Sequence, residues 1–489
     1  MSPAGNVLLL PWPALGHLSP MLQFGQRLVA KGLTATIVTT RYINKIADLQ
    51  ADPVAVATIS DGFDEGGFYS AANLEEYLRT LVEVGSRTLS ELIEERAAAA
   101  APFTCMVYDT FTPWAADVAK RHGLLTVAFS TQSCAVSAIY YYVNKGILEV
   151  PKEGEKAAPE GMPEMVRSDF PSFVFDESRK GSQLTMATVA LNQFNVKKDD
   201  LVLFNSFDEL ENKVTESLKK YMRVTNIGPC VPLSAASYGV PFTEVADETC
   251  MRWLDGNPAG STVYVSFGSI ASLSTAQMSE LAAGLEASGK RFLWVVRSEE
   301  RNKLPPEFLQ RPPERGLVVR WCPQLRVLSH PAVGCFLTHC GWNSTLEALS
   351  FGVPMVAFGL WSDQPTDAKC VEDVWGVGVR VRTAAETGLV AREEIERCVR
   401  AVMEGERSEE MRRNSRRLKD SARKALSKGG SSDTNIDELV AFVNRKAAAA
   451  KKHDLFKGIL TVVGLSGAIF VLMRGITALR RTVRSGCSY

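Results

Sequence analysis

The stretch NVLLLPWPALGHLSPMLQFGQRLVAKGLTATIVTT (6–40) decides the fold that we predict for this chain. It holds two short apolar runs, 6–12 and 34–40, and each run predicts a buried strand. Between them lies a helical pattern, in which Ser19 can cap the helix and Pro20 can take its first position. A strand, a loop, a helix and a strand in this order open a doubly wound parallel sheet.

The same alternation continues along the chain in two blocks, separated by a Gly-, Pro- and Ser-rich stretch at 224–242 that predicts a linker. The further apolar runs of strand length are 104–109, 124–129 and 201–207 in the first block, and 261–270, 291–297, 316–321, 333–339 and 353–358 in the second. We therefore predict an α/β fold with two facing Rossmann-like domains and an interdomain cleft that holds the site.

The predicted organisation has four parts. A first domain spans 1–240, a second spans 241–430, a closing helix spans 431–446, and an extension spans 447–489. The extension contains an apolar run at 458–473 flanked by Lys and Arg. Its 16 residues (473 − 458 + 1) fall short of the ~20 that usually span a membrane. Snorkelling of the basic side chains would still permit a membrane anchor, so an anchor, a surface-lying segment and an unrelated extension stay open.

Composition narrows the possible partners. The formal net charge of the 489 residues is zero, which argues against nucleic acid as a partner. The N-terminus MSPAGNVLLLPWP lacks a basic region before its apolar run, so we predict no signal peptide. The ten cysteines form no C-x-x-C pair, as in a reducing compartment. We predict a cytoplasmic, monomeric protein.

Polar and aromatic side chains gather where the strands of the second block end. Trp321 offers a flat face for a base, and Gln324 can pair with base edges. His339 ends a strand, and Asn343 and Ser344 follow at the start of a helix, a common way to hold phosphate oxygens. Other candidates at the same sheet edge are Ser266 and Ser269 for the phosphates, Glu347 for ribose hydroxyls, and Asp363 with Gln364 for a hexose.

The segment Trp321–Gln364 resembles the 44-residue signature box of the plant family of UDP-dependent small-molecule glycosyltransferases. The box begins with Trp, contains HCGWNS and Glu, and ends in Asp-Gln, and the pattern P-x-P-x-x-G-H-x-x-P (11–20) is also similar to that family. The resemblance covers about residues 6–445 and implies the GT-B type of fold. Gly359 departs from the pattern, because proline or another residue is expected there, and the extension has no counterpart in the family.

The resemblance also implies a role for each matching residue. It assigns uracil to Trp321, Cys322 (through its main chain) and Gln324, and ribose to Glu347. It assigns the diphosphate to Ser266, Ser269, His339, Asn343 and Ser344, and the sugar to Trp342, Asp363 and Gln364. The closing Gln resembles family members that use UDP-glucose.

The proposed base lies in the first domain. Inverting transfer needs a group that accepts the acceptor proton, and histidine suits neutral pH. Among five histidines, only His17 falls in the loop after the first strand. Asp109, at the end of another strand, can orient the imidazole, and the resemblance assigns these same two roles. A helix-capping role for His17 and a turn-forming role for Asp109 remain the alternatives. No D-x-D motif is present, so we expect neither a metal nor another cofactor beside the UDP-glucose co-substrate.

The acceptor is the least determined feature. Phe111, Phe129, Tyr140 and Tyr141 could line an aromatic pocket or belong to the core. The resemblance favours glucosylation of a plant hormone, a phenolic, an acid or a xenobiotic. A non-catalytic nucleotide-sugar or small-molecule binding protein is the alternative. A dinucleotide oxidoreductase is disfavoured, because no G-x-G-x-x-G follows the first strand.

Overall fold

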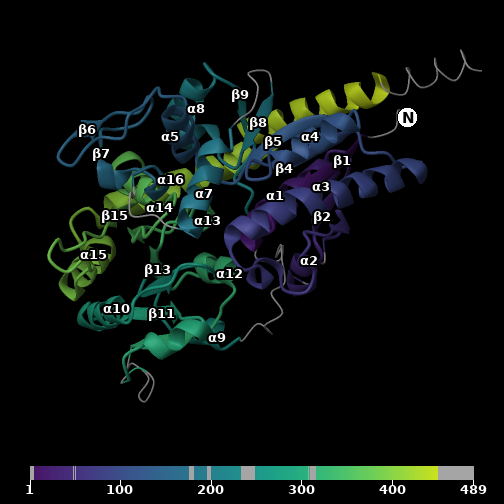
Figure 1. Cartoon of the computed structure of the whole chain (residues 1–489). Coiled ribbons are helices and arrows are strands. Elements are labelled where there is room, and N and C mark those ends of the chain that lie inside the picture. The colour runs from purple at the N-terminus through teal and green to yellow at the C-terminus, as the bar shows by residue number, and fades with distance from the viewer. Residues whose placement is uncertain are drawn as a thin grey trace, which may run out of the picture.

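The computed structural model describes residues 5–47, 49, 51–175, 181–194, 200–232, 248–306, 308 and 315–449. They form two α/β domains, each built on a parallel sheet with helices on both faces (Figure 1). The predicted fold class is confirmed.

The first sheet has seven parallel strands in the order β3-β2-β1-β4-β5-β8-β9. The central strands are short and mostly apolar, because helices cover both faces of the sheet and leave neither face exposed to water. Their bounds are β1 (Asn6–Leu10), β2 (Thr34–Thr40), β3 (Ala55–Ile59), β4 (Cys105–Asp109), β5 (Leu125–Ser130), β8 (Leu201–Phe204) and β9 (Arg223–Asn226).

The helices of the first domain are α1 (Leu15–Ala30), α2 (Arg41–Ala47), α3 (Leu74–Ala98), α4 (Trp114–Arg121), α5 (Cys134–Asn144), α6 (Ser172–Phe175), α7 (Ser182–Asn192) and α8 (Asp208–Leu218). The connection between α5 and α6 carries the two-stranded ribbon β6 (Lys156–Ala157) and β7 (Met165–Val166), and then the 3₁₀ turn η2 (Arg167–Asp169).

The second sheet has six parallel strands in the order β12-β11-β10-β13-β14-β15. The strands are β10 (Thr262–Ser266), β11 (Arg291–Val295), β12 (Gly316–Val319), β13 (Val333–Thr338), β14 (Met355–Ala357) and β15 (Gly378–Arg380). The helices are α9 (Thr249–Asp255), α10 (Thr275–Ala287), α12 (Gln324–Ser329), α13 (Trp342–Phe351), α14 (Gln364–Lys369), α15 (Arg392–Glu404) and α16 (Ser408–Leu426).

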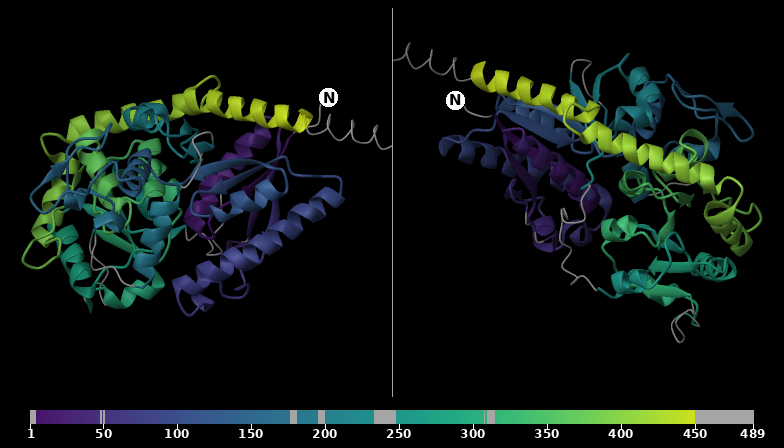
Figure 2. Two further views of the ribbon diagram at one scale, coloured as in Figure 1. Left: turned by 45° about the horizontal axis from the view of Figure 1, so that its top comes forward. Right: turned by 180° about the vertical axis from the view of Figure 1, so that it is seen from behind.

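The chain returns to the first domain at its end. Residues 431–449 form a helix, and Figure 2 shows α16 and this helix running one after the other along one side of both domains, in yellow. Ile436, Leu439 and Val443 pack into the same core as β1 and α1. Asn435 Nδ2 donates to the carbonyl of Asn226 at 2.8 Å. The predicted closing helix is therefore a structural part of the first domain.

Two predicted element boundaries were wrong, and two strands were missed. Helix α1 begins at Leu15, five residues before the predicted start, so Pro20 lies inside it. The predicted linker 224–242 begins within β9, a short edge strand whose four residues give little periodic signal. Strands β3 and β15 were not predicted, because their runs are short and mixed in polarity.

The two domains meet along the carboxyl edges of their sheets. Asn343, after β13, donates from Nδ2 to the carbonyl of Gly16, after β1, at 2.6 Å. Ser133, after β5, donates to Asp367 of α14 at 2.8 Å. Because ligands of doubly wound sheets bind beyond these same edges, the candidate site lies between the domains.

The predicted membrane contact at 458–473 falls outside the described residues. Among the residues that are described, no helix has both the length and the apolar character needed to cross a membrane.

Candidate active site

The ends of three neighbouring strands in the first sheet place two oxygen atoms within hydrogen-bonding distance of one histidine nitrogen. His17 lies in the first turn of α1, not in a loop as predicted, and its side chain is partly exposed. Its Nδ1 lies 2.7 Å from Oδ2 of Asp109, the last residue of β4, and 2.9 Å from Oγ1 of Thr131, which follows β5. Because strands β1, β4 and β5 are adjacent in the sheet, their ends deliver all three side chains to one point.

Asp109 is itself held in place. The carboxylate is fully buried, and its Oδ1 accepts a hydrogen bond from the main-chain N–H of Phe111 at 2.9 Å. The Phe111 ring meets the edge of His17, with ring centroids 5.3 Å apart. The imidazole is therefore fixed on one side by hydrogen bonds and on another by an aromatic ring. Thr131 was not predicted, although its place after a core strand matches that of Asp109.

In the second domain, the predicted base- and ribose-reading residues form one hydrogen-bonded group. Gln324, the first residue of α12, accepts from the Tyr264 hydroxyl at 2.9 Å. Its Nε2 donates to Ser344 Oγ at 3.0 Å and to Glu347 Oε2 at 2.5 Å. Burial raises the pKa of Glu347 to about 7, and the bond from Gln324 opposes that rise. Neighbouring Trp321 is partly exposed, whereas Cys322 is buried and its thiol points to Tyr264.

His339 lies directly after β13, framed by two glycines. A Cβ at Gly268 would lie 2.8 Å from its ring, and one at Gly341 would lie 2.6 Å from it, so glycine is required at both positions. Burial lowers the pKa of His339 to about 4, and the ring is therefore neutral at physiological pH. Its Nδ1 is buried and has no hydrogen-bond partner among the described residues. Ser266 is the last residue of β10, and Ser269 lies in the turn after it, which also contains Gly268.

The predicted sugar-reading pair lies at the start of α14. Oδ2 of Asp363 accepts from the main-chain N–H of Trp342 at 3.3 Å. Oε1 of Gln364 accepts from the amides of Leu360 and Trp361 at 3.0 and 3.2 Å. Burial raises the pKa of Asp363, and at the adjacent Asp367 both burial and repulsion from Asp363 raise it.

Gly359, the residue that departs from the family pattern, lies in this turn where two main-chain segments come close. A Cβ on Gly359 would come within 2.8 Å of the Gln364 carbonyl oxygen. The close approach of the two main-chain segments is what requires glycine here.

Three predicted side chains lie elsewhere. The Trp342 indole is buried at the domain interface and donates to the carbonyl of Asn205 at 2.8 Å, so only its main chain reaches the predicted sugar site. Phe129 has no exposed surface and stacks on Phe24 in the core. Tyr141 packs against Tyr221, in a different cluster from Phe111.

The other two aromatic residues predicted for the acceptor pocket do come together. Phe111 and Tyr140 belong to one buried cluster with Phe173 of α6, and Trp12 packs against it. The cluster touches His17 through Phe111.

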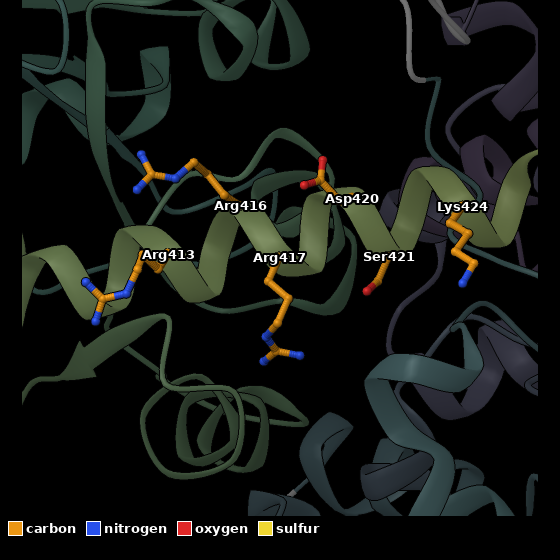
Figure 3. Close-up of a pocket in the computed structure, with 6 residues that line it drawn as sticks. All are labelled: Arg413, Arg416, Arg417, Asp420, Ser421 and Lys424. Atoms are coloured by element: carbon orange, nitrogen blue, oxygen red, sulfur yellow. The ribbon is translucent and has the colours of Figure 1, made fainter.

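A separate hollow lies on the outer face of α16 and contains none of the predicted site residues. Figure 3 shows its lining, which is Arg413, Arg416, Arg417, Asp420, Ser421 and Lys424.

Two α/β domains with parallel sheets that meet along their carboxyl edges have the GT-B type of fold, and comparison with known proteins shows the family. Residues 243–429 match the family model for UDP-glucuronosyl and UDP-glucosyl transferases. The chain is 51% identical over 476 residues to an indole-3-acetate beta-glucosyltransferase of Zea mays, covering 92% of this chain and 100% of the relative. It is 46% identical to UDP-glycosyltransferase 74F2 of Arabidopsis thaliana, covering 90% and 99%.

A solved structure gives the same assignment. Os79 from O. sativa, crystallised in complex with UDP, superposes with a TM-score of 0.82 at 44% identity, covering 89% of this chain and 100% of that one. The chain described above belongs to the UDP-glycosyltransferase family, and it is an enzyme that transfers a sugar from a UDP-sugar to a small molecule.

Proposed function

We propose that this enzyme transfers glucose from UDP-glucose to a hydroxyl or carboxyl group of a small apolar acceptor, with inversion at the anomeric carbon. The observation that carries the proposal is the position of His17. Its Nδ1 is bound by Asp109 and Thr131, and the residue before it is bonded across the domain boundary to Asn343 of the HCGWNS turn. A base held at the edge of the proposed diphosphate site is what direct displacement requires.

On the donor side, the proposed roles follow the geometry. Trp321 would stack on uracil, and the Cys322 main chain and Gln324 would read its edge. Glu347 would accept hydrogen bonds from the ribose. Ser266, Ser269, Asn343, Ser344 and the amides at the start of α13 would hold the diphosphate, since a helix N-terminus favours negative charge. The neutral His339 would add one N–H donor without adding charge.

The transfer step uses one base. As a hydroxyl oxygen of the acceptor attacks the anomeric carbon, its proton passes to Nε2 of His17, and the bond from that carbon to the diphosphate oxygen breaks; an ionised carboxylate attacks in the same way without giving up a proton. The electron pair leaves with UDP. Asp109 stabilises the imidazolium that forms, as the carboxylate does in a catalytic triad. The amides of α13 and His339 stabilise the charge on the leaving diphosphate.

Asp363, Gln364 and the main chain of Trp342 would read the hydroxyls of the glucose. On the acceptor side, Phe111, Tyr140 and Phe173 would form the aromatic wall beside His17. The maize relative is named for indole-3-acetate, and an Arabidopsis relative, 44% identical, is named a flavonol 7-O-beta-glucosyltransferase. An aromatic acid or a phenol therefore fits the proposed pocket best.

Mass spectrometry of reactions with UDP-glucose and a panel of aromatic acids and phenols tests the proposal. We expect one hexose to be added to at least one acceptor, and the rate to fall when His17 is replaced by Ala. Tight binding of UDP without any transfer would favour the alternative, a non-catalytic binding protein.

We also propose that the reaction needs no metal ion, because the helix amides and His339 provide the positive field at the diphosphate. Adding EDTA to the assay should leave the initial rate unchanged. A loss of rate that Mg²⁺ restores would contradict this prediction.

We further propose a monomer whose catalytic domains face the cytosol. Whether the apolar run 458–473 attaches these domains to a membrane is decided by fractionating cells that express the full chain or a chain ending at residue 449. A full chain found only in the soluble fraction rules the anchor out.

A further inference from the structure

A proline inside α1 leaves one main-chain carbonyl without its helical partner. Pro20 is the sixth residue of the helix that begins at Leu15. The carbonyl of Gly16 would normally accept from the N–H of the residue four positions later, and that residue is Pro20. Proline has no N–H, and its ring also pushes the carbonyl four residues earlier away from the helix axis.

A side chain of the second domain donates a hydrogen bond to this carbonyl instead. Asn343 Nδ2 donates to the Gly16 oxygen at 2.6 Å. Asn343 is the second residue of α13, whose N-terminus forms the proposed diphosphate site, and Gly16 directly precedes His17. The approach is unobstructed, because even a Cβ on Gly16 would lie 3.6 Å from Nδ2.

We propose that Pro20 and Asn343 are positioning residues that couple donor binding to the placement of His17. Pro20 turns the Gly16 carbonyl outward, and one amide hydrogen of Asn343 binds it. The second amide hydrogen remains for a diphosphate oxygen of the donor. A bound UDP-sugar would fix the Asn343 side chain, and through its bond to Gly16 it would restrain further the first turn of α1, which carries the base. This inference rests on the roles of His17 and Asn343 proposed above.

The chemistry of the variant Pro20→Ala makes the proposal testable. Alanine restores the N–H, which can bond to Gly16 within the helix, and removes the ring that tilts the carbonyl. Because alanine favours helix interiors that proline disfavours, the variant should keep its thermal stability. A folded enzyme with a weakened link between the domains is therefore expected.

The experiment is a double-mutant cycle with Asn343→Ala. We expect Pro20→Ala to lower kcat about fivefold, as for the loss of one hydrogen bond, while the Kd for UDP changes less than about twofold. In the Asn343→Ala background, Pro20→Ala should have no further effect on kcat. An unchanged kcat in Pro20→Ala, or the same fold loss in both backgrounds, would overturn the inference.

Two controls separate this inference from the proposed function. Turnover by the wild type and its loss in His17→Ala test the function itself in the same series. Amide hydrogen exchange over residues 15–19 needs no turnover: saturating UDP should slow exchange there in the wild type but not in Asn343→Ala. Equal protection in both proteins would contradict the coupling even if no acceptor were turned over.

Discussion

At the scale of single residues, His17 has two oxygen partners on one nitrogen. With Asp109 2.7 Å and Thr131 2.9 Å from Nδ1, the tautomer with a proton on Nδ1 is favoured, because the carboxylate only accepts. Nε2 then carries the lone pair that accepts the acceptor proton. The contribution of His17 to the rate therefore depends on the pKa of the acceptor group that attacks.

We predict that His17→Ala discriminates between classes of acceptor. For a phenol, kcat/KM should fall by about 10³, within the range of general base catalysis. For a carboxylic acid, which is already ionised near neutral pH, the fall should be about tenfold or less. Initial rates of both proteins with one phenol and one aromatic acid measure the contrast. An equal loss with both acceptors would remove His17 from the role of base.

Glu347 gives a prediction in which stability and binding change in opposite directions. Its pKa is raised from 4.5 to about 7 by burial, so its ionisation opposes folding. This cost is absent below about pH 4.5, grows as the pH rises, and is complete above about pH 7. Glu347→Gln should therefore match the wild type near pH 4.5 and exceed its free energy of unfolding by about 3 kcal/mol at pH 8. Denaturant titrations at the two pH values measure the difference.

The same variant should bind UDP more weakly at pH 8, because an amide is a poorer partner than a carboxylate for two ribose hydroxyls. Calorimetric titration with UDP checks this expectation. A variant that is more stable and also binds UDP as tightly as the wild type would show that Glu347 does not contact the ribose.

At the scale of elements, the segment from η2 to α6 links the two halves of the proposed site. Ser362 has a positive φ of 60°, which is unfavourable for a residue other than glycine. Its N–H donates to Ser172 Oγ at 2.8 Å, and its carbonyl accepts from the Ser172 N–H at 2.9 Å. Phe173 of α6 meets the ring of Trp361 on the neighbouring turn.

We predict that this bridge keeps Asp363 in position to read the sugar. Ser172→Ala removes one hydrogen bond and should raise the KM for UDP-glucose about fivefold, with little change in the Kd for UDP. Adding Ser362→Gly should recover part of the loss, since glycine adopts positive φ without strain. If UDP and UDP-glucose were weakened equally, the bridge would support the domain in general and not the sugar site.

Much of the element-level arrangement could be predicted, for a physical reason. Buried parallel strands are continuous apolar runs, and the ends of such runs mark one sheet edge, so Asp109, His339 and Asp363 could be placed there from the sequence. Thr131 was missed because a single threonine after a strand carries no pattern. Periodicity does not show which residues contact the other domain, so the burial of the Trp342 indole could not be predicted. The choice between core and pocket stayed open for Phe129, because an aromatic residue in a strand looks the same in both.

At the scale of the whole molecule, the C-terminal helix should determine the stability of the first domain. Ile436 is fully buried in the core that contains β1 and α1. Ile436→Ala should lower the free energy of unfolding by about 2–5 kcal/mol. Glu438→Ala, at an exposed position of the same helix, should change it by less than about 0.5 kcal/mol. Denaturant titrations of both variants test this, and similar effects at the two positions would contradict the assignment.

The return of this helix also constrains how the protein is made. A ribosome completes β9 about 200 residues before it reaches Ile436. At about 5–20 residues per second, the first sheet waits roughly 10–40 seconds with the apolar surface for that helix uncovered. During synthesis the N-terminal half therefore exposes an apolar face until the last helix is made, and aggregation of the unfinished chain is most favoured in this interval.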